Sequence, residues 1–423
     1  MTETPIGSAV HLENPPASLT ATEQPADGSR AVVRALSAVT FLEWSGASVG
    51  LPLLPVYLER RGATSVTVGL VVASYFVAAL LLQYVFGRLV DRIGAAPVLR
   101  AGLVVFAIGG LTLALPLMPG MYAVSRVLQG AGAGAAEVAA LAAVGVAVPD
   151  TQRGRAFANI YGSQLAGMAI GPMVGSLIGA FSVTGVFVAG GLISLLAFIP
   201  VMLLPGRGSG LAVRPEKHQE TQADSEPDPS QASEQSMARR VLIGALVSAA
   251  AFGLTVGVYE VCWSLLLTSR GAHNWQVGLS WTLFCIPFVV ASRPAGRLAD
   301  TVDRRHLVVV ALAVALGCCI TYPFLHSLVA LMLLGVVEAG ATALAIPSVQ
   351  SLLSQGTPVH RLGRAQGLFA TAETSTTALA AAVSGSLFSV RPWIPFVSGG
   401  VVGIVLIAML PAIWATVVGR ARG

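Results

Sequence analysis

Twelve apolar stretches recur along the chain, each at the length that a helix needs to cross a membrane. A hydrocarbon layer about 30 Å thick is spanned by roughly 17 to 25 mostly apolar residues in a helix. The stretches lie at 34–58, 66–86, 97–117, 121–148, 156–180, 183–204, 240–268, 275–295, 306–325, 328–350, 362–389 and 394–418. Charged residues are only 11% of the 423 residues, whereas a soluble domain carries about 25%. The sequence therefore predicts an all-α membrane protein with 12 transmembrane helices, and it excludes collagen-like, disulfide-rich, disordered and nucleic-acid-binding classes.

A polar segment at 205–239 divides these stretches into two groups of six. Its Glu, Asp, Gln, Ser and Pro content is typical of a flexible linker. Residues 1–33 are also polar and lack the apolar core of a secretory signal, so they predict a disordered tail. We therefore expect one six-helix half at 34–204, a second at 240–418, and a short tail at 419–423.

The basic residues indicate how the chain is oriented. With the linker in the cytoplasm, 20 of the 25 basic residues lie inside, and one, Arg126, lies within a helix. The four on the outside are Arg60, Arg61, Arg270 and Arg391. Because cytoplasmic loops carry the excess of Lys and Arg, this bias predicts that both termini and the linker are cytoplasmic. We expect a multi-pass protein of a bacterial cell membrane.

The two halves repeat one another. Residues 58–70 (LERRGATSVTVGL) match residues 267–279 (LTSRGAHNWQVGL) at seven of thirteen positions, 209 residues later. The same offset aligns residues 87–91 with 296–300 and residues 149–156 with 358–365. Parallel repeats of this kind are typical of transporters in which one half rocks against the other about a midplane site.

The loop after the second stretch carries charges beside glycines in both halves. Its first copy contains Gly87, Arg88, Asp91, Arg92 and Gly94, and its second contains Gly296, Asp300, Asp303 and Arg304. A carboxylate beside guanidinium groups at a helix end can latch two helices in one state and release them in another. Twelve helices in two halves with this loop resemble the major facilitator superfamily, and the loop resembles its signature motif. The resemblance implies a membrane transporter with a gate at the cytoplasmic side.

Two further stretches strengthen the resemblance. The fourth contains Arg126 and Gln129 and is similar to the family motif associated with proton coupling; alternatively, Arg126 reaches the outer interface one turn away. The fifth contains Gly167, Gly171, Pro172 and Gly175 and resembles the motif of the superfamily's antiporters, with Ser176 in place of the usual final glycine. Glycines at a four-residue spacing let another helix approach closely. Together with the first stretch, these motifs resemble the twelve-helix drug:proton antiporter group, which implies export.

Five glutamates lie within predicted helices: Glu43, Glu137, Glu260, Glu338 and Glu373. An ionised carboxylate in lipid costs at least about 2.5 to 3.5 kcal/mol, so these groups must face a wet cavity or hold a proton. The resemblance implies that helices one, four, seven and ten line the central cavity, which brings four of the five together. We hypothesise that Glu43 and Glu137, tuned by Arg126, exchange a proton for the substrate.

The predicted function is proton-coupled export of small amphiphilic, cationic or drug-like compounds. Import or facilitated diffusion of sugars or small organic metabolites remains the alternative, because the superfamily hosts both directions on one fold. The chain contains no clustered hydrolase or HExxH set, so we do not expect an enzyme. We expect no cofactor beyond the proton gradient, no metal site and no nucleic-acid partner, since the four cysteines lie in apolar runs without CxxC spacing. We expect a monomer in the bilayer.

Overall fold

The first half of the chain is a bundle of helices that begins before the predicted first span. The structure is a computed structural model that describes residues 27–202, 229–301, 303–357 and 359–415. Its first half contains α1 (Asp27–Gly50), η1 (Leu51–Leu53), α2 (Leu54–Arg60), α3 (Ser65–Ile93), α4 (Ala95–Thr112), η2 (Pro119–Met121), α5 (Tyr122–Ala147), α6 (Asp150–Gly179), α7 (Val183–Leu196) and α8 (Phe198–Met202). The first span is α1–η1–α2, which is interrupted where Pro52 and Pro55 remove helical donors.

The second half has the same order of helices. It contains α9 (Pro229–Ser269), α10 (Asn274–Thr301), α11 (Arg304–Thr321), η3 (Tyr322–Phe324), α12 (Leu328–Gln355), α13 (Val359–Val390), α14 (Ile394–Ala408) and α15 (Leu410–Trp414). Within the described residues, nine helical spans are long and apolar enough to cross a membrane. The helices α6, α10 and α13 complete the predicted twelve, and all three pack at the contact between the halves. The predicted fold class is confirmed.

Two predicted boundaries are wrong. The first helix begins at Asp27, inside the predicted tail 1–33, and α9 begins at Pro229, inside the predicted linker 205–239. Both extensions carry polar and basic side chains, so a search for apolar stretches does not detect them. The rest of the tail, residues 1–26, the linker residues 203–228 and the C-terminal residues 416–423 lie outside the described residues.

The repeat is visible in the backbone. Gly62 and Gly271 have φ angles of 85° and 84°, which favour glycine, and each ends the helix that precedes it. The amide of Ala63 donates to the Leu58 carbonyl at 3.0 Å, and the amide 209 residues later donates to the corresponding carbonyl at the same distance. The starts of α3 and α10, of α4 and α11, and of α6 and α13 also lie 209 residues apart. The halves are therefore parallel structural repeats.

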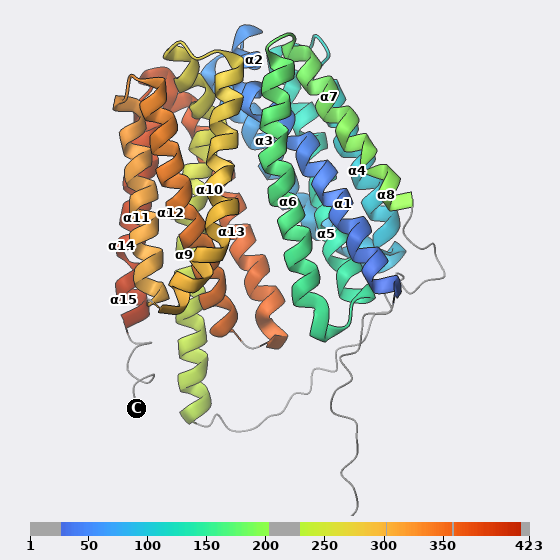
Figure 1. The fold of residues 1–423 in the computed structure, drawn as a ribbon, viewed down its shortest axis with the longest axis vertical. Helices are drawn as coiled ribbons and strands as arrows, with labels where there is room; N and C mark the ends of the chain where they lie inside the picture. The colour runs from blue at the N-terminus through green and yellow to red at the C-terminus, as the bar shows by residue number, and fades with distance from the viewer. Residues whose placement is uncertain (1–26, 203–228, 302, 358, 416–423) are drawn as a thin grey trace, which may run out of the picture.

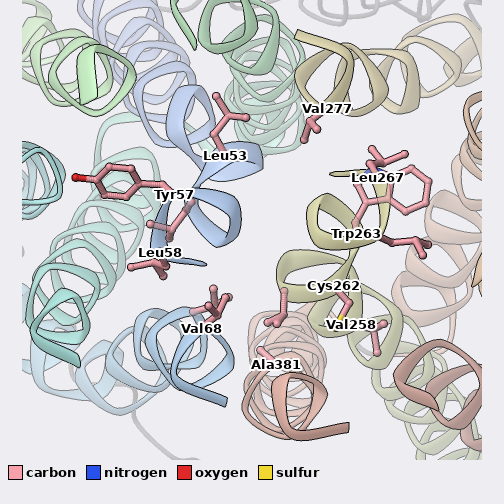
Figure 2. Close-up of a cluster of buried hydrophobic side chains, with 14 of the residues drawn as sticks. Leu53, Tyr57, Leu58, Val68, Val258, Cys262, Trp263, Leu267, Val277 and Ala381 are labelled. Carbon is pink, nitrogen blue, oxygen red and sulfur yellow. The ribbon is translucent and has the colours of Figure 1, made fainter. Parts of the chain in front are cut away.

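The two halves are joined at one end of the bundle and have separate cores at the other. Figure 1 shows the halves side by side, with the start of α9, which follows the linker, at the bottom. One apolar cluster, opposite the linker, includes residues of both halves, among them Leu53, Tyr57, Trp263 and Leu267 (Figure 2). Two further clusters at the linker end belong to one half each. We call the end of the bundle with the shared cluster the closed end, and the opposite end, beside the linker, the linker end.

Polar contacts reinforce the closed end. Asn274, the first residue of α10, donates from Nδ2 to the Gly179 carbonyl at 3.1 Å, and its Oδ1 accepts from Arg60 Nη2 at 3.2 Å. The Ser264 hydroxyl on α9 donates to the Pro52 carbonyl across the same contact. These bonds cap the end of α6 and tie both halves together, so the described residues form a state that is shut at the closed end.

The helices α3 and α13 cross at the closed end where glycines replace side chains. A Cβ atom on Gly385 would overlap the Ser65 carbonyl oxygen, and one on Gly69 would lie 2.7 Å from the Ala381 carbonyl oxygen. Real Cβ atoms do not approach backbone so closely, so this crossing requires glycine at both positions.

We therefore expect Gly385→Val to weaken the contact between the halves. Overpacking of a tight contact costs about 1–3 kcal/mol, so the midpoint of thermal unfolding of the purified chain in detergent should fall. Gly317→Val on α11 is the matched control, because a Cβ atom there would meet no atom within 4 Å. Equal midpoints for the two variants would contradict this account of the crossing.

Candidate functional site

The guanidinium group of Arg126 lies inside the first half and not at its surface. Arg126 on α5 is 5% exposed, its Nη1 donates to Gln129 Oε1 at 2.9 Å, and its Cζ lies 4.4 Å from the centroid of the Tyr75 ring. Tyr75 comes from α3, which approaches α5 closely at Gly130 because glycine has no Cβ atom. A Cβ atom at this position would overlap the Tyr75 carbonyl. Within the described residues the Arg126 Nε has no hydrogen-bond partner. A cation–π contact and one amide therefore hold the charge.

Four of the five glutamates, all in the described part of the chain, lie within the range of Coulombic interaction with one another or with this pair, without hydrogen bonds between them. Glu43 on α1 interacts with Glu137 on α5, and Glu137 interacts with Glu373 on α13. Glu260 on α9 interacts with Arg126. Tyr75 is within electrostatic range of three of these carboxyls. We call Glu43, Glu137, Glu260 and Glu373 the acidic group; two of its members come from each half.

Members of the acidic group differ in their access to solvent. Glu43 is 7% exposed, whereas Glu137 is exposed although it lies in the second half of the α5 span. The Glu137 Oε2 accepts a hydrogen bond from Gln83 Nε2 at 3.4 Å. The Glu137 side chain therefore lies at an accessible surface of the packed helices, next to Gln83, whereas Glu43 is enclosed. Carboxyls are groups that can hold a proton or attract a cation.

Glu338 lies apart from the acidic group, contrary to the expectation that it lines the same cavity. It is 2% exposed, Tyr259 donates to its Oε1 at 2.7 Å, and Tyr322 donates to its Oε2. Trp263 stacks edge-on against Tyr322 with centroids 4.7 Å apart, and the Tyr259 ring lies 6.3 Å from that of Phe396. An aromatic cage in the second half thus encloses this carboxyl and satisfies both of its oxygens.

The first copy of the charged loop is unlatched in this structure. Arg88, Asp91 and Arg92 are exposed near the end of α3, and within the described residues Asp91 has no ion pair. Gly94 has a φ of 89° and joins α3 directly to α4, a turn that favours glycine. A Cβ atom on Gly87 would meet no atom within 4 Å, so no helix packs closely there. The predicted latch residues are in place but not engaged.

The second copy of the loop has a local role at its far end. Asp303 caps the start of α11, since its Oδ1 accepts from the Arg305 amide at 3.0 Å and its Oδ2 lies 3.5 Å from His306 Nδ1. Arg304 is half-buried at the first position of that helix. The backbones of Gly296 and Asp300 belong to α10, but their surroundings lie outside what the structure describes.

The glycines of the fifth span pack closely against another helix, as predicted, and the structure shows that this helix is α1. A Cβ atom on Gly167 would lie 2.5 Å from the Phe41 carbonyl oxygen, and one on Gly175 would overlap the Val49 carbonyl. Gly171, one turn between them, faces the α1 backbone in the same way. The α6 stripe therefore fixes the position of α1, which carries Glu43.

Pro172 interrupts α6 at its contact with the other half. Because proline has no amide hydrogen, the Met168 carbonyl loses its helical donor. The Cys285 thiol on α10 lies 3.8 Å from that carbonyl oxygen and donates to it. A Cβ atom on Gly278 would lie 2.8 Å from the Pro172 carbonyl oxygen, so α10 packs directly on the interrupted turn.

Sequence reasoning missed Tyr75 and Cys285. Tyr75 belongs to no motif, and only the contact with Gly130 places its ring under Arg126. Cys285 is one of the four cysteines in apolar runs, and its hydrogen bond depends on how α10 crosses α6. The one signal in the sequence was Pro172, because a proline inside a helix leaves the carbonyl four residues earlier in need of another donor. Among the described residues no group of three His, Cys, Asp or Glu side chains is arranged to hold a metal ion.

Comparisons with known proteins agree with this architecture. The family model of the Major Facilitator Superfamily matches residues 36–268 and 241–422. The fold resembles that of a bacterial homologue of the human lysosomal transporter Spinster, solved in an inward-facing, unoccupied conformation, with a TM-score of 0.73, 13% identity and coverage of 92% of this chain and 97% of that chain. A D-xylose-proton symporter has a TM-score of 0.70 at 18% identity, over 90% and 96% of the two chains. The chain belongs to the Major Facilitator Superfamily.

Curated relatives match only part of the chain. Quinolone resistance protein NorA of Staphylococcus aureus (strain MRSA252) is 27% identical over 164 residues, which are 39% of this chain and 42% of that protein. A chloramphenicol resistance protein of Pseudomonas aeruginosa is 32% identical over 149 residues, which are 35% of this chain and 36% of that protein. The chain thus spans less than half the length of these relatives. It is a multi-pass membrane transporter with drug-efflux relatives.

The contact between Tyr75 and Arg126 predicts a difference between two substitutions. Tyr75→Leu removes the ring below the guanidinium, and a desolvated cation–π contact is worth about 2 kcal/mol, so the midpoint of thermal unfolding should fall. Tyr75→Phe keeps the ring and should unfold close to the unmodified chain. If both variants unfold like the unmodified chain, the ring does not hold Arg126.

The cage around Glu338 predicts a second difference. Glu338→Leu leaves the Tyr259 and Tyr322 hydroxyls without their acceptor, and a buried unpaired polar group costs about 1–3 kcal/mol. Glu338→Gln keeps one acceptor oxygen and should be destabilised less. Thermal unfolding of both purified variants measures the difference, and an equal loss would show that the carboxyl is not an acceptor for both tyrosines.

Proposed function

We propose that the protein is a proton-coupled exporter of small amphiphilic, drug-like compounds that works by alternating access. The observation that carries the proposal is the acidic group, which is assembled from both halves beside a buried arginine. Carboxyls drawn from both halves change their mutual distances when the halves rock, which is what coupling requires. The names of the two curated relatives, a quinolone and a chloramphenicol resistance protein, support a drug-like substrate.

Competition between proton and substrate accounts for antiport. While the closed end is shut, the acidic group communicates with the linker end, where an amphiphilic cation enters and takes the place of protons. Opening of the closed end must separate the shared apolar cluster and break the bonds of Asn274. Protons then return to the carboxyls and release the substrate. In that state, Asp91 engages the basic residues of its loop and latches the linker end.

Export is favoured over import by the α6 stripe with Pro172, which resembles the antiporter motif. The excess of basic residues at the linker end supports an orientation with that end and both termini in the cytoplasm of a bacterial cell. The transporter works as a monomer, without a cofactor, on the proton gradient. Import of a sugar or small metabolite is the alternative, since a proton symporter of D-xylose has the same fold.

The coupling proposal is tested with Glu43→Gln and Glu137→Gln. In inverted vesicles with an imposed pH gradient, an amphiphilic cation should dissipate the gradient for the unmodified chain, and at least one of the two variants should lose this activity by about tenfold or more. Glu59→Gln on α2 is the matched control, because Glu59 is exposed at the closed end.

Normal proton-driven efflux in both variants would overturn the assignment of these carboxyls. Transport of only a sugar or small acid, inward, would overturn export itself.

A further inference from the structure

Two carbonyl groups of the first half lie in helical turns where a proline removes their donor. In α6 the Met168 carbonyl would accept from the amide four residues later, but that residue is Pro172. In η1 the bonding pattern pairs the Pro52 carbonyl with the amide three residues later, and that residue is Pro55. Both carbonyls therefore need a donor from outside their own helix, because an unpaired carbonyl within a membrane is costly.

The second half supplies both donors from buried side chains. The Cys285 thiol of α10 lies 3.8 Å from the Met168 carbonyl oxygen and donates to it, and Cys285 is 5% exposed. The Ser264 hydroxyl of α9 donates to the Pro52 carbonyl, and Ser264 is 1% exposed. These two interrupted turns of the first half are thus completed by a thiol and a hydroxyl of the second.

The repeat provides an internal comparison for the donor on α10. An offset of 209 residues relates the contact between α10 and α6 to the contact between α3 and α13. There Phe76 stands at the position of Cys285, and its side chain has no donor. Ala381 stands at the position of Pro172 and keeps its amide within the continuous helix α13. The side-chain donor therefore accompanies the proline, and the equivalent contact without the proline does without it.

We propose that Cys285 and Ser264 are positioning residues whose donors hold the interrupted turns of the first half while the closed end is shut. When the closed end opens, both bonds break, and water or another donor takes their place at the two carbonyls. Loss of a donor therefore destabilises the shut state more than the open state and shifts the population toward opening. The inference rests on the alternating access of the proposed function and names two contacts that govern it.

A double-substitution cycle tests whether the thiol acts through the freed carbonyl. With Pro172 present, Cys285→Ala should lower the midpoint of thermal unfolding of the purified chain by about 1–3 °C. In the Pro172→Ala background the restored amide occupies the Met168 carbonyl, so Cys285→Ala should cause no further shift. Cys262→Ala is the matched control, because the Cys262 thiol donates at 3.7 Å to the Ser384 carbonyl, whose own helical donor lies within α13. Its effect should be the same in both backgrounds.

The same cycle applies to the hydroxyl. Ser264→Ala should lower the midpoint while Pro55 is present, and it should have no further effect in the Pro55→Ala background, where residue 55 regains an amide for the Pro52 carbonyl.

A labelling experiment reads the opening itself and leaves the prolines unchanged. Ser176 of α6 is 7% exposed, and a Cβ atom on Gly278 of α10 would overlap it. A thiol introduced by Ser176→Cys therefore reacts with a charged methanethiosulfonate reagent when this contact opens. We expect the reaction to be at least threefold faster in combination with Cys285→Ala than with Cys285→Ser, which keeps a donor at the same place. Peptide mass mapping separates the introduced thiol from the native cysteines.

Equal shifts from either donor variant with and without its proline would overturn the inference, and so would equal labelling rates for Cys285→Ala and Cys285→Ser. The labelling comparison stands even if a proline substitution prevents folding. Failure of the proposed function is seen separately: the cycles and the labelling would give the expected results, but an amphiphilic cation would not dissipate a pH gradient in vesicles.

Discussion

A charged side chain inside a membrane protein must have a partner or water, and this constraint organises the interior of the molecule. Arg126 meets it with a tyrosine ring and an amide, Glu338 with two tyrosine hydroxyls, and Glu137 with the Gln83 amide. The position of the Tyr75 ring depends on α3 approaching α5 at Gly130. Close backbone packing is therefore what positions the Arg126 charge.

The fold was predictable because it depends on features that can be recognised in the sequence alone. Span lengths, the linker and the offset of 209 residues follow from hydropathy and sequence identity, and the turn glycines Gly62 and Gly271 are part of the matched segment. Helix ends were less predictable, since polar turns beyond the apolar stretch extend α1 and α9 without an apolar signal.

The site was predictable in its residue types but not in its grouping. The cost of charge in lipid singled out the five glutamates, yet it does not say which of them face each other. Glu338 was separated from the others by aromatic residues on α9 and η3, and Glu373 joined them because of how α13 packs against α3. Contacts between elements far apart in sequence decide such cases, and a single sequence does not encode them in any local pattern.

The repeat also shows where the two contacts between the halves differ. Gly69 faces Ala381 where α3 meets α13. The offset of 209 residues relates these two positions to Gly278 and Pro172, which face each other where α10 meets α6.

Ala381 continues a regular helix, whereas Pro172 frees the Met168 carbonyl, which accepts a hydrogen bond from a thiol of the other half. When the halves rock, the α3–α13 side can slide while its own helical bonds stay intact. The α6–α10 side must exchange the Cys285 bond for another donor or for water. An unpaired carbonyl in hydrocarbon is costly, so movement on that side requires a replacement donor or the entry of water, and the two otherwise equivalent contacts need not open alike.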